Sequence, residues 1–289
     1  MNSDLERRYR WLLRIYPDAY RADHEDEIMS TLAEVSREDQ RWPSGREARA
    51  LLAAGIRLRA LTAGGGSPTG LVVDGLHLGS VLLVAGNAVG AVFAAYAGNS
   101  DRWHVALGLA WVFAFATLVR GGWILPVAAA AAAAALAVWL SYDALVAQPA
   151  QWFAWAQVAA GALLPAVLIA VLAHRRPLPG RSPLLLLVPA VPYALAMGIV
   201  VSPFFLTSTL FAVLVVVSGI ALLALPLDPR PAIAVAVFLV PTISLLIAGA
   251  AQNVALWVEP SWTWPSVWAL ICVTLATSGV RASRRVARI

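Results

Sequence analysis

The chain of 289 residues is 60% hydrophobic and only 13% charged, and its mean hydropathy is +0.75. Soluble domains carry about 25% charged residues, so this composition excludes an ordinary soluble fold and predicts an integral membrane protein. The formal net charge is +5, the chain has no lysine, and its single cysteine, Cys272, excludes an internal disulfide.

Residues 1–62 are polar enough to lie in water, and their pattern predicts three amphipathic helices. We expect the first helix to end before Pro17, and a capping box of Ser44 and Glu47 to open the third. Apolar residues recur at spacings of three and four. They are Leu5, Tyr9, Leu12, Leu13, Tyr16, Tyr20, Ile28, Leu32, Val35, Leu51, Leu52 and Ile56.

The charges of residues 1–62 cancel, because eleven arginines face eleven acidic residues. A nucleic-acid-binding domain needs a net basic surface, so direct nucleic-acid binding is not expected. The middle helix is acidic and its neighbours are basic, which favours mutual packing into a small cytoplasmic domain.

The segment from residue 8 to residue 35 carries a further pattern. Its residues are Leu12, Leu13, Tyr16, Pro17, Tyr20, Arg21, Asp26, Glu27 and Met29. The segment resembles the permease prefix domain, which precedes the membrane spans of some actinobacterial transporters, and the HAAS signalling domain that accompanies PadR-type regulators. The resemblance implies a helical module that couples a variable membrane part to a cytoplasmic partner. Its candidate partner surface is Tyr16, Pro17, Tyr20, Arg21, Asp26 and Glu27.

Residues 63–70 form a glycine-rich linker that we expect to be flexible. Residues 71–280 follow as a predicted bundle of eight spans, since a span needs roughly 20 apolar residues. The apolar stretches lie at about 71–96, 103–119, 122–140, 152–173, 183–202, 204–225, 232–251 and 264–280. A charged segment of about 70 residues precedes the first, so we expect no signal peptide and an uncleaved anchor.

The distribution of arginine orients these spans, because arginine concentrates in cytoplasmic loops. With the N-terminus inside, the outer loops carry only Arg102. The inner connections carry Arg120, Arg175, Arg176, Arg181 and Arg230, and the basic tail is residues 281–289. The pattern predicts a multi-pass protein of a bacterial plasma membrane with both ends in the cytoplasm. The tail arginines are candidates for contact with anionic lipid headgroups, although orientation alone explains them.

Polar residues inside the spans are candidate site residues. Asp74 and His77 share one helix face near the inner end of the first span, as a proton or cation site or as a structural pair. We favour the structural interpretation, since Asp74 is close enough to the linker to be wet.

Two amides lie deeper in the spans. Asn87 sits in a GxxxG motif of Gly86 and Gly90, which predicts a helix contact with a cross-helix hydrogen bond, within one chain or between copies. Gln157 is expected to act in the same way. A homo-oligomer is therefore an open alternative.

An outer loop near residues 252–265 holds a further candidate pocket. Trp257, Glu259, Trp262 and Trp264 could roof an apolar or cationic ligand, with Glu259 as the counter-charge. An interfacial tryptophan belt explains the same residues without a ligand, and we favour it.

Motifs that carry chemistry are missing from the sequence. His24 and Glu25 begin like a zincin helix, but Ile28 occupies the position of the second histidine ligand. No catalytic residues, metal site or cofactor are therefore expected, and an enzyme is not predicted.

The sequence favours a non-enzymatic signalling or regulatory protein whose N-terminal helices relay the state of the membrane to a cytoplasmic regulator. The alternative is a transporter, or a permease subunit that works with a separate ATPase. A transporter requires a polar pathway at mid-membrane depth. Apart from Asn87 and Gln157, the deep positions are apolar. The lipid bilayer is a partner in either case.

Overall fold

A computed structural model describes most of the chain. The described residues are 3–37, 40–63, 65–96, 102–147, 159–175, 178–190, 215–255 and 263–286. Within these ranges every regular element is a helix, and the only β contact is an isolated bridge between Gly122 and Leu178. The predicted all-α class is therefore confirmed.

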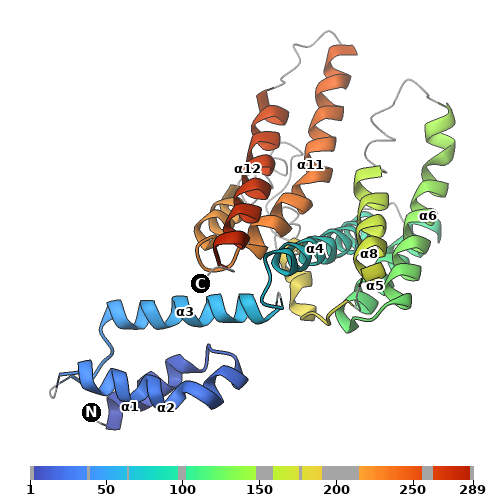
Figure 1. The fold of residues 1–289 in the computed structure, drawn as a ribbon. Coiled ribbons are helices and arrows are strands. Elements are labelled where there is room, and N and C mark those ends of the chain that lie inside the picture. The colour runs from blue at the N-terminus through green and yellow to red at the C-terminus, as the bar shows by residue number, and fades with distance from the viewer. Residues whose placement is uncertain are drawn as a thin grey trace.

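The N-terminal part contains α1 (Ser3–Leu13), α2 (Asp18–Val35) and α3 (Gly45–Ala63). In Figure 1, α1 and α2 lie on the side of α3 that faces away from the other helices. The core residues shared by these helices are Leu5, Tyr9, Leu12, Leu13, Tyr16 and Met29. The predicted apolar face of the first helix is confirmed. Tyr20, Ile28 and Leu32 of α2 pack against this core as predicted, beside Met29, but the prediction for Val35 is wrong, because Val35 is 69% exposed.

The start of α3 has the predicted capping box. The backbone N–H of Glu47 donates to Ser44 Oγ at 3.2 Å, and the Ser44 N–H donates back to Glu47 Oε2 at 2.9 Å. Tyr9 of α1 donates to the same carboxylate oxygen at 2.6 Å. The cap of α3 is therefore also a tie to α1.

The predicted linker contains an ordered turn. Gly65 and Gly66 have φ of 64° and 71°, and the N–H of Gly66 donates to Leu61 O at 2.8 Å, which ends α3. Ser67 then caps α4 (Pro68–Tyr96) by accepting from the N–H of Gly70 at 3.0 Å. The turn from α3 into α4 is thus hydrogen-bonded at both helix ends.

The helix α4 lies at the centre of the remaining fold (Figure 1). On one side are α5 (Arg102–Arg120), α6 (Ile124–Ala147) and α8 (Leu164–Arg175), which pack with α4 around an apolar cluster that includes Leu118 and Ile169. On the other side are α11 (Arg230–Ala255) and α12 (Thr263–Val286), which share a second cluster with the helix at 215–224.

Three helices in the described ranges are long and apolar enough to cross a membrane: Pro68–Val92, Ile124–Tyr142 and Pro265–Val286. Further apolar helices are shorter. Residues 191–214 are outside the described residues, and they include most of the expected fifth span (183–202) and half of the expected sixth (204–225). Large apolar side chains such as Leu223, Leu270 and Val273 are exposed on the outside of these helices. The chain is therefore a membrane protein by the length, composition and surface of its helices.

The two ends of this helical assembly differ. Trp103 and Trp139 meet edge to face with ring centroids 4.9 Å apart, near the end of α4 that lies far from Asp74. At the opposite end, the turn after α5 pairs with the segment after α8, and the start of α11 reaches the start of α4. The segments that carry Arg120, Arg181 and Arg230 therefore meet at one end.

Candidate functional site

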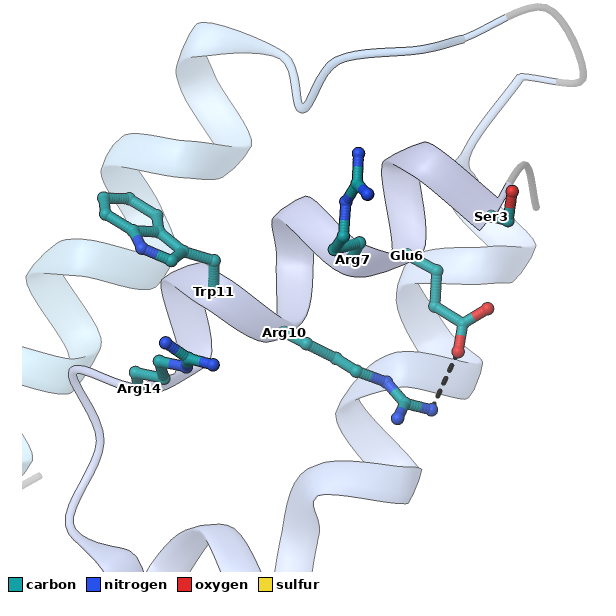
Figure 2. Close-up of a pocket in the computed structure, with 6 residues that line it drawn as sticks. All are labelled: Ser3, Glu6, Arg7, Arg10, Trp11 and Arg14. Atoms are coloured by element: carbon teal, nitrogen blue, oxygen red, sulfur yellow. Dashed lines mark hydrogen bonds and ion pairs between the residues drawn. The ribbon is translucent and has the colours of Figure 1, made fainter.

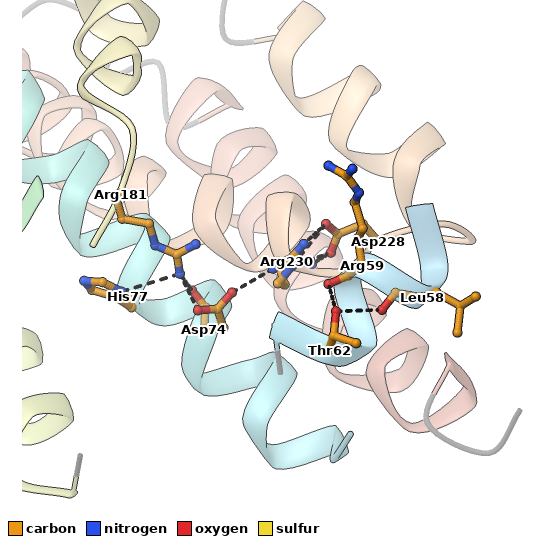
Figure 3. A network of polar contacts seen from close by, with 8 residues as sticks. All are labelled: Leu58, Arg59, Thr62, Asp74, His77, Arg181, Asp228 and Arg230. Atoms are coloured by element: carbon orange, nitrogen blue, oxygen red, sulfur yellow. Dashed lines mark hydrogen bonds and ion pairs between the residues drawn. The ribbon is translucent and has the colours of Figure 1, made fainter. Parts of the chain in front are cut away.

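The most elaborate polar arrangement in the described residues is centred on Asp74, in the second turn of α4 (Figure 3). Its side chain is only 3% exposed. One carboxylate oxygen accepts a hydrogen bond from Arg181 Nη2, and the other accepts from Arg230 Nη1 at 2.9 Å. We call Asp74, His77, Arg181, Asp228 and Arg230 the charge cluster.

Backbone contacts place Arg181. Gly122 and Leu178 exchange hydrogen bonds of 3.0 and 3.1 Å, and the N–H of Arg181 donates to Val119 O at 2.8 Å. Gly121 makes this close approach possible, because it has a φ of 79° and a Cβ there would lie 2.6 Å from Leu178 O. The segment after α8 is therefore held against the end of α5, with its arginine directed at α4.

The turn before α11 places the second arginine. Asp228 accepts from the backbone N–H of Arg230 at 3.0 Å, and its two oxygens accept from Arg230 Nε and Nη2 at 2.9 and 2.7 Å. A carboxylate at this position also interacts favourably with the positive end of the helix dipole. Arg230 thus joins two carboxylates, Asp228 of its own turn and Asp74 of α4.

His77 completes the charge cluster one turn along α4 from Asp74. It is 2% exposed, and its Nδ1 lies 3.5 Å from Arg181 Nη2. The predicted proximity of Asp74 and His77 on one helix face is correct. Both side chains face protein, and neither has the exposure expected of a wet site.

The charge cluster has two carboxylates and two guanidinium groups, so its formal charge is zero with His77 neutral. No group of three or more His, Cys, Asp or Glu side chains that could hold a metal occurs among the described residues. What the arrangement does physically is to fix α4, the segment after α8 and the turn before α11 to one another. Buried charges of this kind are costly when unpaired, so each partner depends on the others.

The prediction that Asp74 is wet is wrong, because two arginines distant in sequence cover it. Arg181 is 107 residues away and Arg230 is 156 residues away. In the sequence, both arginines indicated only the orientation of the spans. Their position next to tight turns, beside Gly180 and Asp228, was the signal that could have marked them as structured.

Of the two amides predicted deeper in the spans, only Asn87 lies in the described residues. Asn87 donates from Nδ2 to the backbone carbonyl of Gly161 at 2.7 Å, in a π-helical turn at Ala159–Leu163, so the predicted cross-helix hydrogen bond is confirmed. Gln157 lies outside the described residues. So do Trp257, Glu259 and Trp262, while Trp264 falls in the first turn of α12 with its side chain outside the description.

The candidate partner surface of the N-terminal helices is divided by the structure. Tyr16 is 4% exposed and belongs to the core, which removes it from any surface. Tyr20 is half-buried, stacked on Tyr16 at 5.7 Å and on His24 at 4.3 Å. Arg21 pairs with Asp18 at 2.9 Å. Pro17 is partly buried, and Asp26 and Glu27 are exposed on α2.

A different surface of these helices was not predicted. A shallow pocket of about 580 Å³ runs along the outer side of α1 and is lined by the residues in Figure 2. Trp11 is 66% exposed there. The other lining residues are Ser3, Glu6, Arg7, Arg10 and Arg14. We call this surface the α1 face. The sequence signal at this helix was its apolar side, which lies opposite these residues and gave no indication of a surface pocket.

The end of α3 joins the N-terminal helices to the rest of the chain. Ala60 of α3, Leu71 of α4 and Val286 of α12 form a small buried cluster. Beside it, Arg57 Nε donates to the backbone carbonyl of Pro226 at 2.9 Å. A displacement of α12 or of the turn at Pro226 would therefore act directly on α3.

Comparison with family models, with curated proteins and with solved structures gives no match to this chain.

Proposed function

We propose that this chain is a non-enzymatic signalling or regulatory protein of a bacterial plasma membrane. In this proposal eight spans form a bundle with both chain ends in the cytoplasm. Residues 1–62 form a three-helix domain that passes the state of the bundle to a cytoplasmic partner. The partner is a regulator, in line with the resemblance of residues 8–35 to permease prefix and HAAS segments.

The contact between α3 and the inner ends of α4 and α12 carries this proposal. The cluster of Ala60, Leu71 and Val286 is buried, and Val286 is the last residue of α12. The neighbouring charge cluster fixes the start of α4 to the start of α11. A rearrangement of α4 or α12 that a lipid or ligand induces would shift Leu71 or Val286, and therefore the contacts that hold the end of α3.

The α1 face supplies the surface for the partner. The helix that carries it, α1, lies on the side of α3 remote from the bundle (Figure 1), where a protein in the cytoplasm can reach it. Glu6 pairs with Arg10 at 2.7 Å, whereas the side chain of Arg14 and the indole of Trp11 are exposed and line the pocket. Exposed tryptophan and arginine are the residues that most often carry binding energy at interfaces. An acidic partner surface with a pocket for the indole fits this chemistry.

The alternative function, transport with or without a separate ATPase, has less support. Polar side chains described between α4, α5, α6 and α8 are already bonded to backbone carbonyls: Asn87 donates to Gly161 O, and the hydroxyls of Ser80 and Thr117 donate to carbonyls of their own helices. A transport pathway needs polar groups or water at this depth.

The test is capture of cytoplasmic proteins on the full-length chain in native membranes, with the variants Trp11→Ala and Arg14→Glu. The control is Arg49→Glu, which reverses an exposed charge on α3 outside the α1 face. We expect an identified transcription regulator to bind the unaltered chain and the control, and to lose at least tenfold in affinity for both α1 variants.

Other outcomes count against the proposal. Specific capture of an ATPase would favour the permease alternative. A regulator that binds all variants equally would exclude the α1 face, and failure of every cytoplasmic protein to bind would overturn the relay.

A further inference from the structure

A second pocket lies where α3 meets the end of α12. Its volume is about 480 Å³, within the range of small-ligand sites. Three arginines from two parts of the chain line it, Arg57 of α3 and Arg281 and Arg285 of α12. Its other lining residues are Leu225, Pro226, Ser278, Ala282 and Val286. We call it the α3–α12 pocket.

The charge of this pocket is uncompensated by the described part of the chain. Arg57 donates to a neutral carbonyl, that of Pro226, and neither Arg281 nor Arg285 forms an ion pair with a described carboxylate. Asp228, two residues after the lining residue Pro226, is already bound by Arg230. Three guanidinium groups around one cavity favour an anion with several oxygens, because each can donate two parallel hydrogen bonds.

The surroundings of the pocket indicate where this anion comes from. Arg281 and Arg285 stand in the last two turns of a helix that is long and apolar enough to span a membrane, so they lie at its end. Leu270 is 68% exposed and precedes Arg281 by about three turns on the same helix face. A molecule with an anionic head and an apolar chain fits both features.

We propose that the α3–α12 pocket binds the phosphate headgroup of an anionic phospholipid, whose acyl chain runs along α12 past Leu270. The lipid bridges Arg57 of the N-terminal helices to Arg281 and Arg285 of the last span. Lipid binding at this site does not require a cytoplasmic partner, so it can be tested independently of the proposed relay.

The experiment is native mass spectrometry of the full-length protein released from nanodiscs that contain equal amounts of phosphatidylglycerol and phosphatidylcholine. We expect one phosphatidylglycerol to be retained in preference to phosphatidylcholine. The variants Arg57→Gln, Arg281→Gln and Arg285→Gln each reduce that retention about fivefold. The matched control is Arg284→Gln, which removes the same charge from the same helix turn outside the pocket and leaves retention unchanged.

A second variant separates binding from folding and from general charge. Ala282→Leu keeps every arginine and fills the pocket, and we expect it to reduce retention as strongly as Arg281→Gln. Equal losses in Arg284→Gln and Arg281→Gln, or retention that Ala282→Leu leaves intact, would overturn the proposal.

A soluble competitor distinguishes a lipid from a free phosphate compound. Glycerol phosphate at millimolar concentration is expected to leave the bound phosphatidylglycerol in place. Displacement of the lipid by glycerol phosphate would reassign the pocket to a soluble phosphate ester and overturn the lipid assignment.

Discussion

Gly79 of α4 faces Val237 of α11 so closely that a Cβ at Gly79 would lie 2.7 Å from the Cβ of Val237. Gly75, one turn earlier, stands in the same relation to Ile233, at 2.9 Å. These glycines form a second GxxxG motif in α4, ahead of the predicted one at Gly86 and Gly90. It lets α11 approach α4, and so lets Arg230 reach Asp74.

Gly79→Ala is expected to lower stability by about 1–3 kcal/mol, because the added methyl forces α11 away from α4. The measurement is the thermal midpoint of the full-length protein in a fixed detergent. Gly219→Ala is the control, since Gly219 is also helical and has open space where its Cβ would stand. An unchanged midpoint for Gly79→Ala would contradict the close packing of α4 and α11.

Asp74→Asn is expected to destabilise the protein by about 3–5 kcal/mol, because it leaves Arg181 buried without a counter-charge. Arg181 has no other carboxylate partner among the described residues, whereas Arg230 keeps Asp228. The double variant Asp74→Asn with Arg181→Gln should therefore be more stable than the sum of the two single changes predicts, by about 1–3 kcal/mol. Additive losses from the two single variants would show that the pair is not coupled.

The stability of the N-terminal helices is expected to fall in acid through Glu47. Hydrogen bonds from Tyr9 and from the Ser44 N–H lower the pKa of this carboxyl from its ordinary 4.5. Because the folded state has the lower pKa, the contribution is complete above that ordinary value and disappears as the pH falls through the folded one. Protection factors from hydrogen exchange of α3 should therefore decrease between about pH 5 and 3.

Two variants define this acid response. Glu47→Gln should protect α3 less at neutral pH and respond less to acid. Glu34→Gln, which changes an exposed acid on α2, should behave as the unaltered chain does. If Glu47→Gln retains the full acid response, another carboxyl is responsible.

The proposed topology is tested with single cysteines in a Cys272→Ala background. Ser182→Cys lies beside Arg181 at the end of the bundle where the arginines gather, and Ser100→Cys lies in a predicted outer loop. A membrane-impermeant maleimide should label Ser100→Cys in intact cells and Ser182→Cys only after permeabilisation. Labelling of Ser182→Cys in intact cells would reverse the proposed orientation.

Local signals in the sequence predicted the local structure well. The spacing of Leu5, Tyr9 and Leu12 located the buried side of α1, and Ser44 with Glu47 located the start of α3. Such features depend on neighbours three or four residues away, which the sequence displays directly.

The charge cluster could not be predicted in the same way. Asp74 was expected to be wet because it lies close to the linker, whereas its partners come from turns more than 100 residues later. The concentration of arginine in cytoplasmic loops already accounts for Arg181 and Arg230, so nothing in the sequence indicated that they also pair with Asp74. Tyr16 was assigned to a surface by resemblance, although its spacing from Tyr9, Leu12 and Leu13 in the sequence already predicted burial.

The order of the charge cluster along the chain has a consequence for biosynthesis. Ribosomes add about 5–20 residues per second, so Arg181 follows Asp74 by roughly 5–20 s and Arg230 follows by roughly 8–30 s. During that interval α4 carries the carboxylate of Asp74 without either of its arginine partners. The charge cluster therefore cannot form completely until the turn before α11 has left the ribosome, so the contacts that hold α4 depend on a part of the chain made more than 150 residues later.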